Sequence, residues 1–170
     1  GSRLPALPRV ALMLVALATL APSALAMLVP VQAEGGEAGA ERCDPASLAQ
    51  GLSATVAPQA GGGAPIVLTS DPNVTSELAW RTPLRFVAAP YHRGQSALAD
   101  TAAFFGAADP GAAEAVARRR GISYVLLCPG SWQSEGGFAR RLAEGQAPAW
   151  LEPVEMPGEA GRQAMLWRVR

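Results

Sequence analysis

The distribution of apolar and polar residues divides the chain into an apolar run and a longer mixed segment behind it. Residues 10–31 contain no charged side chain, and about 20 consecutive apolar residues are enough for a helix to cross a bilayer. Residues 34–43 are acidic and rich in glycine. The pattern predicts a transmembrane helix (or a signal peptide) within residues 1–33, a linker over 34–43 and a domain over 44–170.

Two segments of the domain carry the sequence signals of a helix start. Asp44-Pro45 and Asp109-Pro110 combine a good N-cap residue with a proline suited to the first helical turn. Apolar residues then recur at four-residue spacing after Asp44, which predicts one buried helix face. Gly121 is the expected helix stop. Helices are expected over 44–56, 74–80, 97–105, 111–120 and 138–144.

Short apolar runs between these helices predict strands. They cover residues 66–69, 84–89 and 123–127, and the last of these is apolar, as in strands buried on both faces of a parallel sheet. Residues 151–156 and 164–169 flank a Pro157-Gly158 turn and predict a closing hairpin. The predicted fold class is α/β: after the N-terminal transmembrane helix, a small layered domain with a mainly parallel central sheet and a C-terminal β-hairpin.

The charges that flank the apolar run predict its orientation in the membrane. Arg3 and Arg9 precede it, and the next basic residue is Arg42. Because arginine next to a membrane span marks the cytoplasmic side, residues 34–170 are expected outside the cytoplasm. In a bacterium this places the run in the inner membrane and the domain on its periplasmic side.

A secretory signal peptide is the alternative interpretation of the same run. Ala24-Leu25-Ala26 and Val31-Gln32-Ala33 are both possible cleavage sites. Hydrophobicity continues past Ala26, which favours a retained helix, and membrane helices tolerate prolines such as Pro22 and Pro30 where neighbouring helices compensate. Either interpretation exports the rest of the chain.

Composition narrows the function classes. All 14 basic residues are arginine, and with abundant alanine, glycine and proline this is typical of a GC-rich bacterial genome. After residue 31 the chain carries 12 arginines and 14 acidic residues. No basic face or aromatic-basic motif points to nucleic acid, so we expect no nucleic-acid partner.

The chain begins with Gly-Ser, and we expect it to be a fragment of a longer protein.

The two cysteines, Cys43 and Cys128, are candidates for a disulfide. In an oxidising compartment such a pair can form one bond, which would join the start of the domain to its middle. The alternative is that Cys128, at the end of an apolar run, is simply buried. Together with the single His92 the cysteines have no zinc-ligand spacing, so we expect neither a metal nor another cofactor.

The three central strands each end in polar or loop-forming residues. If the strands are parallel, these ends meet at one edge of the sheet, where open α/β sheets bind ligands. The edge is therefore the predicted ligand-binding site, with residues Asp71, Tyr91, His92, Arg93, Ser131 and Trp132.

Each of these residues also has a structural interpretation. A single histidine more often makes a structural hydrogen bond than catalyses, Arg93 could pair with Asp100 or Asp71, and Asp71 before Pro72 is an ordinary turn residue. Ser131, His92 and Asp71 could be drawn as a triad, but three scattered residues of common types are weak evidence. The sequence therefore predicts no catalytic residue.

Five phrases of the sequence together resemble a known family. With the apolar run, they resemble the C-terminal segment of bacterial multi-spanning membrane proteins of the GT-C glycosyltransferase type. The phrases are RTPLR at 81–85, AAPYHR at 88–93, RRGISYVLLCP at 119–129, PAWLEPV at 148–154 and LWRV at 166–169.

The resemblance implies a last membrane helix followed by an extracytoplasmic α/β domain. The family's catalytic acidic residues lie in a first external loop, to which nothing in this chain corresponds. The whole protein would transfer sugar from a polyprenyl-phosphate donor, and this domain would shape the acceptor site or stabilise the helix bundle. Expected partners are the lipid bilayer, upstream helices of the same protein, and a polyprenyl-linked sugar or its acceptor. A membrane-anchored or secreted domain that only binds or supports remains the alternative.

Overall fold

A computed structural model describes residues 43–57, 63–89, 94–131 and 137–170. All of its helices and strands lie in one compact unit, Gly39–Arg170. The apolar run at 10–31 and residues 34–42 of the linker lie outside the described residues. Within the described ranges, no helix combines the length and the hydropathy that crossing a bilayer requires.

The described strands form one five-stranded sheet in the order β2-β1-β3-β5-β4. β1 is parallel to both β2 and β3, whereas β5 is antiparallel to β3 and to β4. The mainly parallel sheet and the closing antiparallel pair are thus confirmed. The strands are β1 (Ile66–Thr69), β2 (Arg85–Phe86), β3 (Tyr124–Leu127), β4 (Leu151–Val154) and β5 (Met165–Val169).

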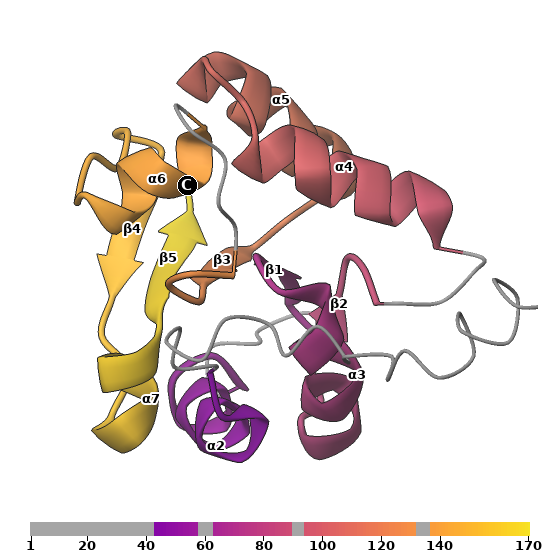
Figure 1. The fold of residues 1–170 in the computed structure, drawn as a ribbon. Helices are drawn as coiled ribbons and strands as arrows, with labels where there is room; N and C mark the ends of the chain where they lie inside the picture. Colours follow the sequence, from indigo (N-terminus) through magenta and orange to yellow (C-terminus); the bar gives the residue numbers. More distant parts are fainter. Residues whose placement is uncertain (1–42, 58–62, 90–93, 132–136) are drawn as a thin grey trace, which may run out of the picture. The chain divides into compact units, whose positions relative to one another are not determined.

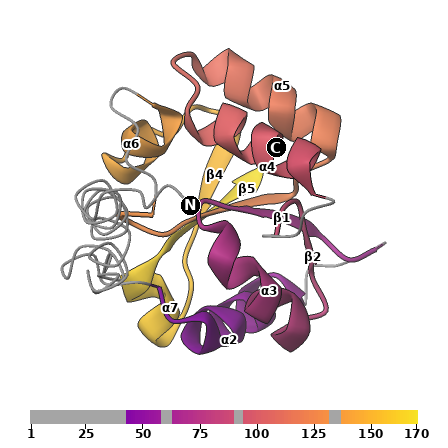
Figure 2. The same cartoon turned by 45° about the vertical axis from the view of Figure 1, so that its right-hand side comes forward.

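Helices cover both faces of the sheet (Figures 1 and 2). One layer consists of α2 (Pro45–Thr55), α3 (Pro72–Arg81) and α7 (Gly158–Gln163). The other consists of α4 (Gln95–Phe105), α5 (Pro110–Arg120) and α6 (Phe138–Ala143). The domain is a three-layer α/β/α sandwich.

The central strand β3 shows why two cores form. Neighbouring side chains of a strand point to opposite faces. Tyr124 and Leu126 accordingly belong to the core under α2, α3 and α7, and Val125 and Leu127 to the core under α4, α5 and α6. All four are buried, as the apolar run predicted.

Three helices begin with the same Asp-Pro pair. The carboxylates of Asp44, Asp71 and Asp109 each accept backbone N–H groups of the first turn that follows. The helix expected over 74–80 therefore begins earlier, at Pro72, because Asp71 caps it. Gly121 ends α5 with a φ of 62°, a conformation that favours glycine, as expected.

Two strand predictions needed correction. β2 covers only Arg85–Phe86 instead of 84–89, because it pairs with β1 over two positions at the edge of the sheet. The link between β4 and β5 is a short helix, α7, rather than a simple Pro157-Gly158 turn. α7 is held by tertiary packing: its Ala160 is buried and lies against Gly51 of α2.

Candidate functional site

The carboxyl ends of the parallel strands β1 and β3 lie side by side, and the connections that follow them leave toward opposite faces of the sheet. β1 leads to α3 on one face of the sheet, while the segment after β3 leads to α6 on the other face (Figure 1). Such switch points leave a crevice outside the strand ends, where α/β proteins bind ligands. Asp71 and Ser131 lie at this edge, whereas Tyr91, His92, Arg93 and Trp132 fall outside the described residues.

Two serines join the ends of β1 and β3. The Ser70 Oγ accepts the backbone N–H of Cys128 at 2.9 Å and lies 2.6 Å from the Ser131 Oγ. The Ser131 hydroxyl in turn donates to the Cys128 carbonyl at 2.5 Å. Ser70 is almost fully buried, with 1% of its surface exposed. The two hydroxyls and one backbone amide therefore form a closed set of hydrogen bonds, which we call the serine clamp.

The hydrogen bonds of the serine clamp join the ends of β1 and β3. A nucleophilic serine needs a general base that takes its proton, but the Ser131 proton is directed to a carbonyl. The Asp71 carboxylate is used elsewhere, since its Oδ1 accepts the Asn73 N–H at 2.9 Å as the cap of α3. Two members of the possible Ser131–His92–Asp71 triad are described, and both Ser131 and Asp71 are engaged in structural hydrogen bonds. Sequence reasoning missed Ser70 because its role depends on the register of β1 and β3.

A disulfide lies directly beside the serine clamp. Cys43 and Cys128 are bonded to each other, both are buried, and their Cα atoms are 6.0 Å apart. The start of α2 is also hydrogen-bonded to α7, because the Asp44 N–H donates to the Gln163 Oε1 at 2.8 Å. The first described residues of the domain are therefore held both to β3 and to α7.

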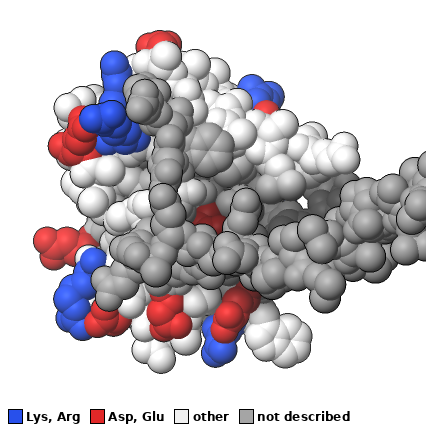
Figure 3. Space-filling view, viewed as in Figure 1, with Lys and Arg blue, Asp and Glu red and all other residues white. Residues whose placement is uncertain are grey.

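Asp100, one suggested partner for Arg93, already binds two arginines. Its carboxylate lies 2.7 Å from Arg119 and 2.5 Å from Arg120, which ties α4 to α5. The Arg120 hydrogen bond is the main cause that lowers the pKa of Asp100. On the face drawn in Figure 3, the described acidic and basic side chains similarly lie next to one another instead of forming a patch of one sign.

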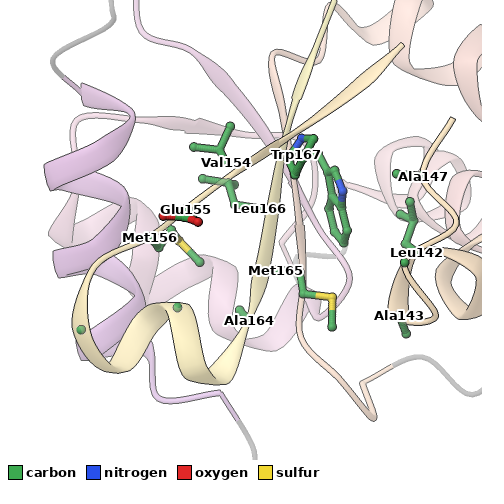
Figure 4. Close-up of a pocket in the computed structure, with 14 residues that line it drawn as sticks. Leu142, Ala143, Ala147, Val154, Glu155, Met156, Ala164, Met165, Leu166 and Trp167 are labelled. Atoms are coloured by element: carbon green, nitrogen blue, oxygen red, sulfur yellow. The ribbon is translucent and has the colours of Figure 1, made fainter. Parts of the chain in front are cut away.

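A groove of about 600 Å³ lies at the β5–β4 edge of the sheet, opposite the β2 edge. It is lined by residues of α6, β4, α7 and β5. Its lining is mostly apolar, and the partly exposed Met165 side chain points from β5 toward Leu142 and Ala143 (Figure 4). Glu155 supplies the one charged side chain of the lining. Sequence reasoning missed this groove because its walls come from four separate segments, and the only hint was an outward methionine in a strand.

Among the described residues, no group of three or more histidine, cysteine, aspartate or glutamate side chains could hold a metal ion.

Comparisons with known proteins find similar solved structures. No family model matches the chain, and no curated protein matches it. The fold is similar to the C-terminal globular domain of an oligosaccharyltransferase from Archaeoglobus fulgidus, with 11% sequence identity and a TM-score of 0.48. The alignment covers 66% of this chain and 88% of that domain.

Proposed function

We propose that residues 44–170 are a non-catalytic domain on the extracytoplasmic side of a bacterial inner membrane, tethered there by the apolar run at 10–31. The Cys43–Cys128 disulfide carries this proposal, because disulfides persist in oxidising compartments and are rare in the cytosol. The flanking charges support it as well, with Arg3 and Arg9 before the run and acidic residues behind it.

The position of the disulfide suits a tethered domain. Cys43 is the last residue of the linker and the first described residue, and its bond reaches Cys128, directly after the central strand β3. Chain ends fray most readily unless they are fastened to the core. A covalent bond at this point fastens the end of the domain that the membrane anchor would pull on.

The finer proposal is that the domain is accessory to sugar transfer from a polyprenyl-phosphate donor. Its support is the resemblance of the sequence to GT-C-type proteins, together with a sheet edge whose described hydroxyls are engaged in structural bonds. The transfer chemistry then belongs to helices upstream of this chain. The domain supports those helices or shapes the acceptor site, and the sheet edge with Arg93 and His92 would contact a phosphate or a sugar hydroxyl.

A second candidate is a membrane-anchored or secreted binding domain with no transferase attached. The groove beside Met165 favours it, since its volume of about 600 Å³ falls within the range of small-molecule sites. The two candidates differ in whether the longer protein transfers sugar.

Membrane vesicles that contain the longer protein, with and without residues 44–170, test the proposal. With a radiolabelled polyprenyl-phosphate sugar, we expect transfer by the intact protein and a marked loss on deletion. Arg93→Ala and His92→Ala in the intact protein test the sheet edge separately. Vesicles that transfer no sugar in either form would contradict the transferase role, and unchanged transfer in both point variants would remove the sheet edge from the proposal.

A further inference from the structure

Trp80 is the most exposed large apolar side chain in the described part of the chain. It lies in the last turn of α3, and 89% of its surface is accessible to solvent. Met165 follows at 37%, and the other large apolar side chains of the described ranges are at least partly covered. Tryptophan is normally well buried, so an indole that is 89% exposed is unusual in the described part of the chain.

A shallow cleft of about 310 Å³ adjoins Trp80 between α3 and α2. The small side chains of Ala46 and Ala49 form its floor together with Gln50 and Ser53. Arg81, on its rim, lies 2.7 Å from Glu77 in an ion pair. The surroundings of the indole are therefore small, weakly polar and close to neutral.

The Trp80 surface lies close to the point where the chain enters the domain. Ala46, which shares the cleft with Trp80, is in the first turn of α2, three positions after Cys43. The pKa of Asp44 is lowered mainly by the Ser47 hydroxyl and N–H, and the Arg81 charge adds to this effect. Arg81 thus lies within electrostatic reach of Asp44.

The chain between the apolar run and Cys43 is short. Residues 32–42 number eleven, and eleven residues span at most about 36–40 Å when fully extended. This length sets an upper limit on the distance between Val31 and Cys43, and the Trp80 surface adjoins the first turn of α2, next to the start of the domain.

We propose that Trp80 is the contact by which the domain rests on the lipid surface, with its indole among the headgroups. The inference rests on the proposed membrane tether. The flat indole with its single N–H prefers the membrane–water interface to either bulk phase. Because Arg81 is neutralised by Glu77, the contact depends on the indole and not on anionic lipids.

Fluorescence quenching by brominated lipids tests this contact in the full chain. The chain is reconstituted in phosphatidylcholine vesicles with and without bromine on the acyl chains, as the wild type, as Trp80→Phe and as Trp150→Phe. The wild type should lose more emission to bromine than Trp80→Phe does. Trp150→Phe is the matched control, because Trp150 stacks on Phe138 with ring centroids 5.9 Å apart in the opposite layer, and it should leave the bromine effect unchanged.

Two outcomes separate this inference from the proposed function. If the chain floats with the vesicles after an alkaline wash, but wild type and Trp80→Phe are quenched equally, the lipid contact is wrong and the tether stands. A chain that does not float contradicts the tether itself. Strong quenching of Trp80 by acrylamide in vesicles would also overturn the lipid contact, since it would place the indole in water and open to a protein partner.

Discussion

The Cys43–Cys128 disulfide brings together two residues that are 85 positions apart in the sequence. Cys128 directly follows the central strand β3. Its backbone N–H donates to Ser70 and its carbonyl accepts from Ser131 in the serine clamp. Cys43 precedes α2, whose buried residues lie in the same hydrophobic core as Cys128. One short segment at the end of β3 therefore holds β1, through Ser70, and the start of α2, through the disulfide.

Removing the disulfide should strongly lower the free energy of unfolding. For a closed loop of this length, the chain-entropy model predicts a loss of about 4–5 kcal/mol, and measured losses are usually about 2–5 kcal/mol. Urea unfolding of the oxidised wild type and of the Cys43→Ala/Cys128→Ala variant measures it. Equal midpoints for the two proteins would show that the bond adds no stability.

Ser70→Ala should destabilise the domain more than Ser131→Ala. Ser70→Ala removes the acceptor of the buried Cys128 N–H, which should cost about 1–3 kcal/mol. Ser131→Ala removes the hydroxyl that donates to the Cys128 carbonyl and bonds to the Ser70 Oγ. Because the Ser70 hydroxyl keeps the Cys128 carbonyl as an acceptor at 3.5 Å, only about 0.5–1.5 kcal/mol is expected. Paired urea titrations give the order, and a larger loss for Ser131→Ala would contradict the assigned roles in the serine clamp.

Gly51→Ala should destabilise the domain although alanine favours helices. A methyl group at Gly51 would overlap the Ala160 side chain of α7. Overpacking of this kind costs about 1–3 kcal/mol, which exceeds the helix-propensity gain of up to about 1 kcal/mol. The double variant Gly51→Ala/Ala160→Gly should recover most of the loss in a double-mutant cycle, and no recovery would mean that the two residues are not in contact.

Glu152 should make stability depend on pH in the acidic range. Its hydrogen bonds to Arg170 and Arg168 lower its pKa from 4.5 to about 2. A group whose pKa is lower in the folded state stabilises that state above its unfolded pKa and loses this contribution as the pH falls through the folded value. The Glu152 contribution is therefore complete above about pH 5 and disappears toward pH 2.

Glu152→Gln should accordingly flatten the decline of unfolding free energy between pH 5 and pH 2. Glu155→Gln, at an exposed neighbouring position, is the matched control and should leave the wild-type slope nearly unchanged. Carboxyl NMR titration of Glu152 checks the pKa directly, and a midpoint near 4.5 would remove the predicted effect.

Local signals in the sequence predicted much of the fold. The caps Asp44 and Asp109, the stop Gly121 and the apolar run of β3 each depend on neighbouring residues alone, so their elements appear where expected. The same Asp-Pro pair at Asp71 is also typical of an ordinary turn, and the helix expected from residue 74 begins two residues earlier, at Pro72.

The remaining features depend on contacts between distant segments. α7 contains two glycines and little apolar pattern, and it forms because Ala160 packs against Gly51. Strand-end residues indicated the sheet edge, but the serine clamp requires the β1–β3 register, in which Thr69 pairs with Leu126. The groove beside Met165 forms only when α6, β4, α7 and β5 come together. No local sequence pattern predicts that arrangement.

The central claim is that residues 44–170 fold outside the cytoplasm with Cys43 and Cys128 bonded. Acid-quenching of whole cells, followed by denaturation and alkylation with a maleimide of large mass before and after reduction, tests it most directly, because denaturation exposes the buried cysteines. The account predicts no mass shift before reduction and two added labels after it, and free thiols in a strain that lacks its periplasmic thiol oxidase. Two labels before reduction in wild-type cells would contradict the account.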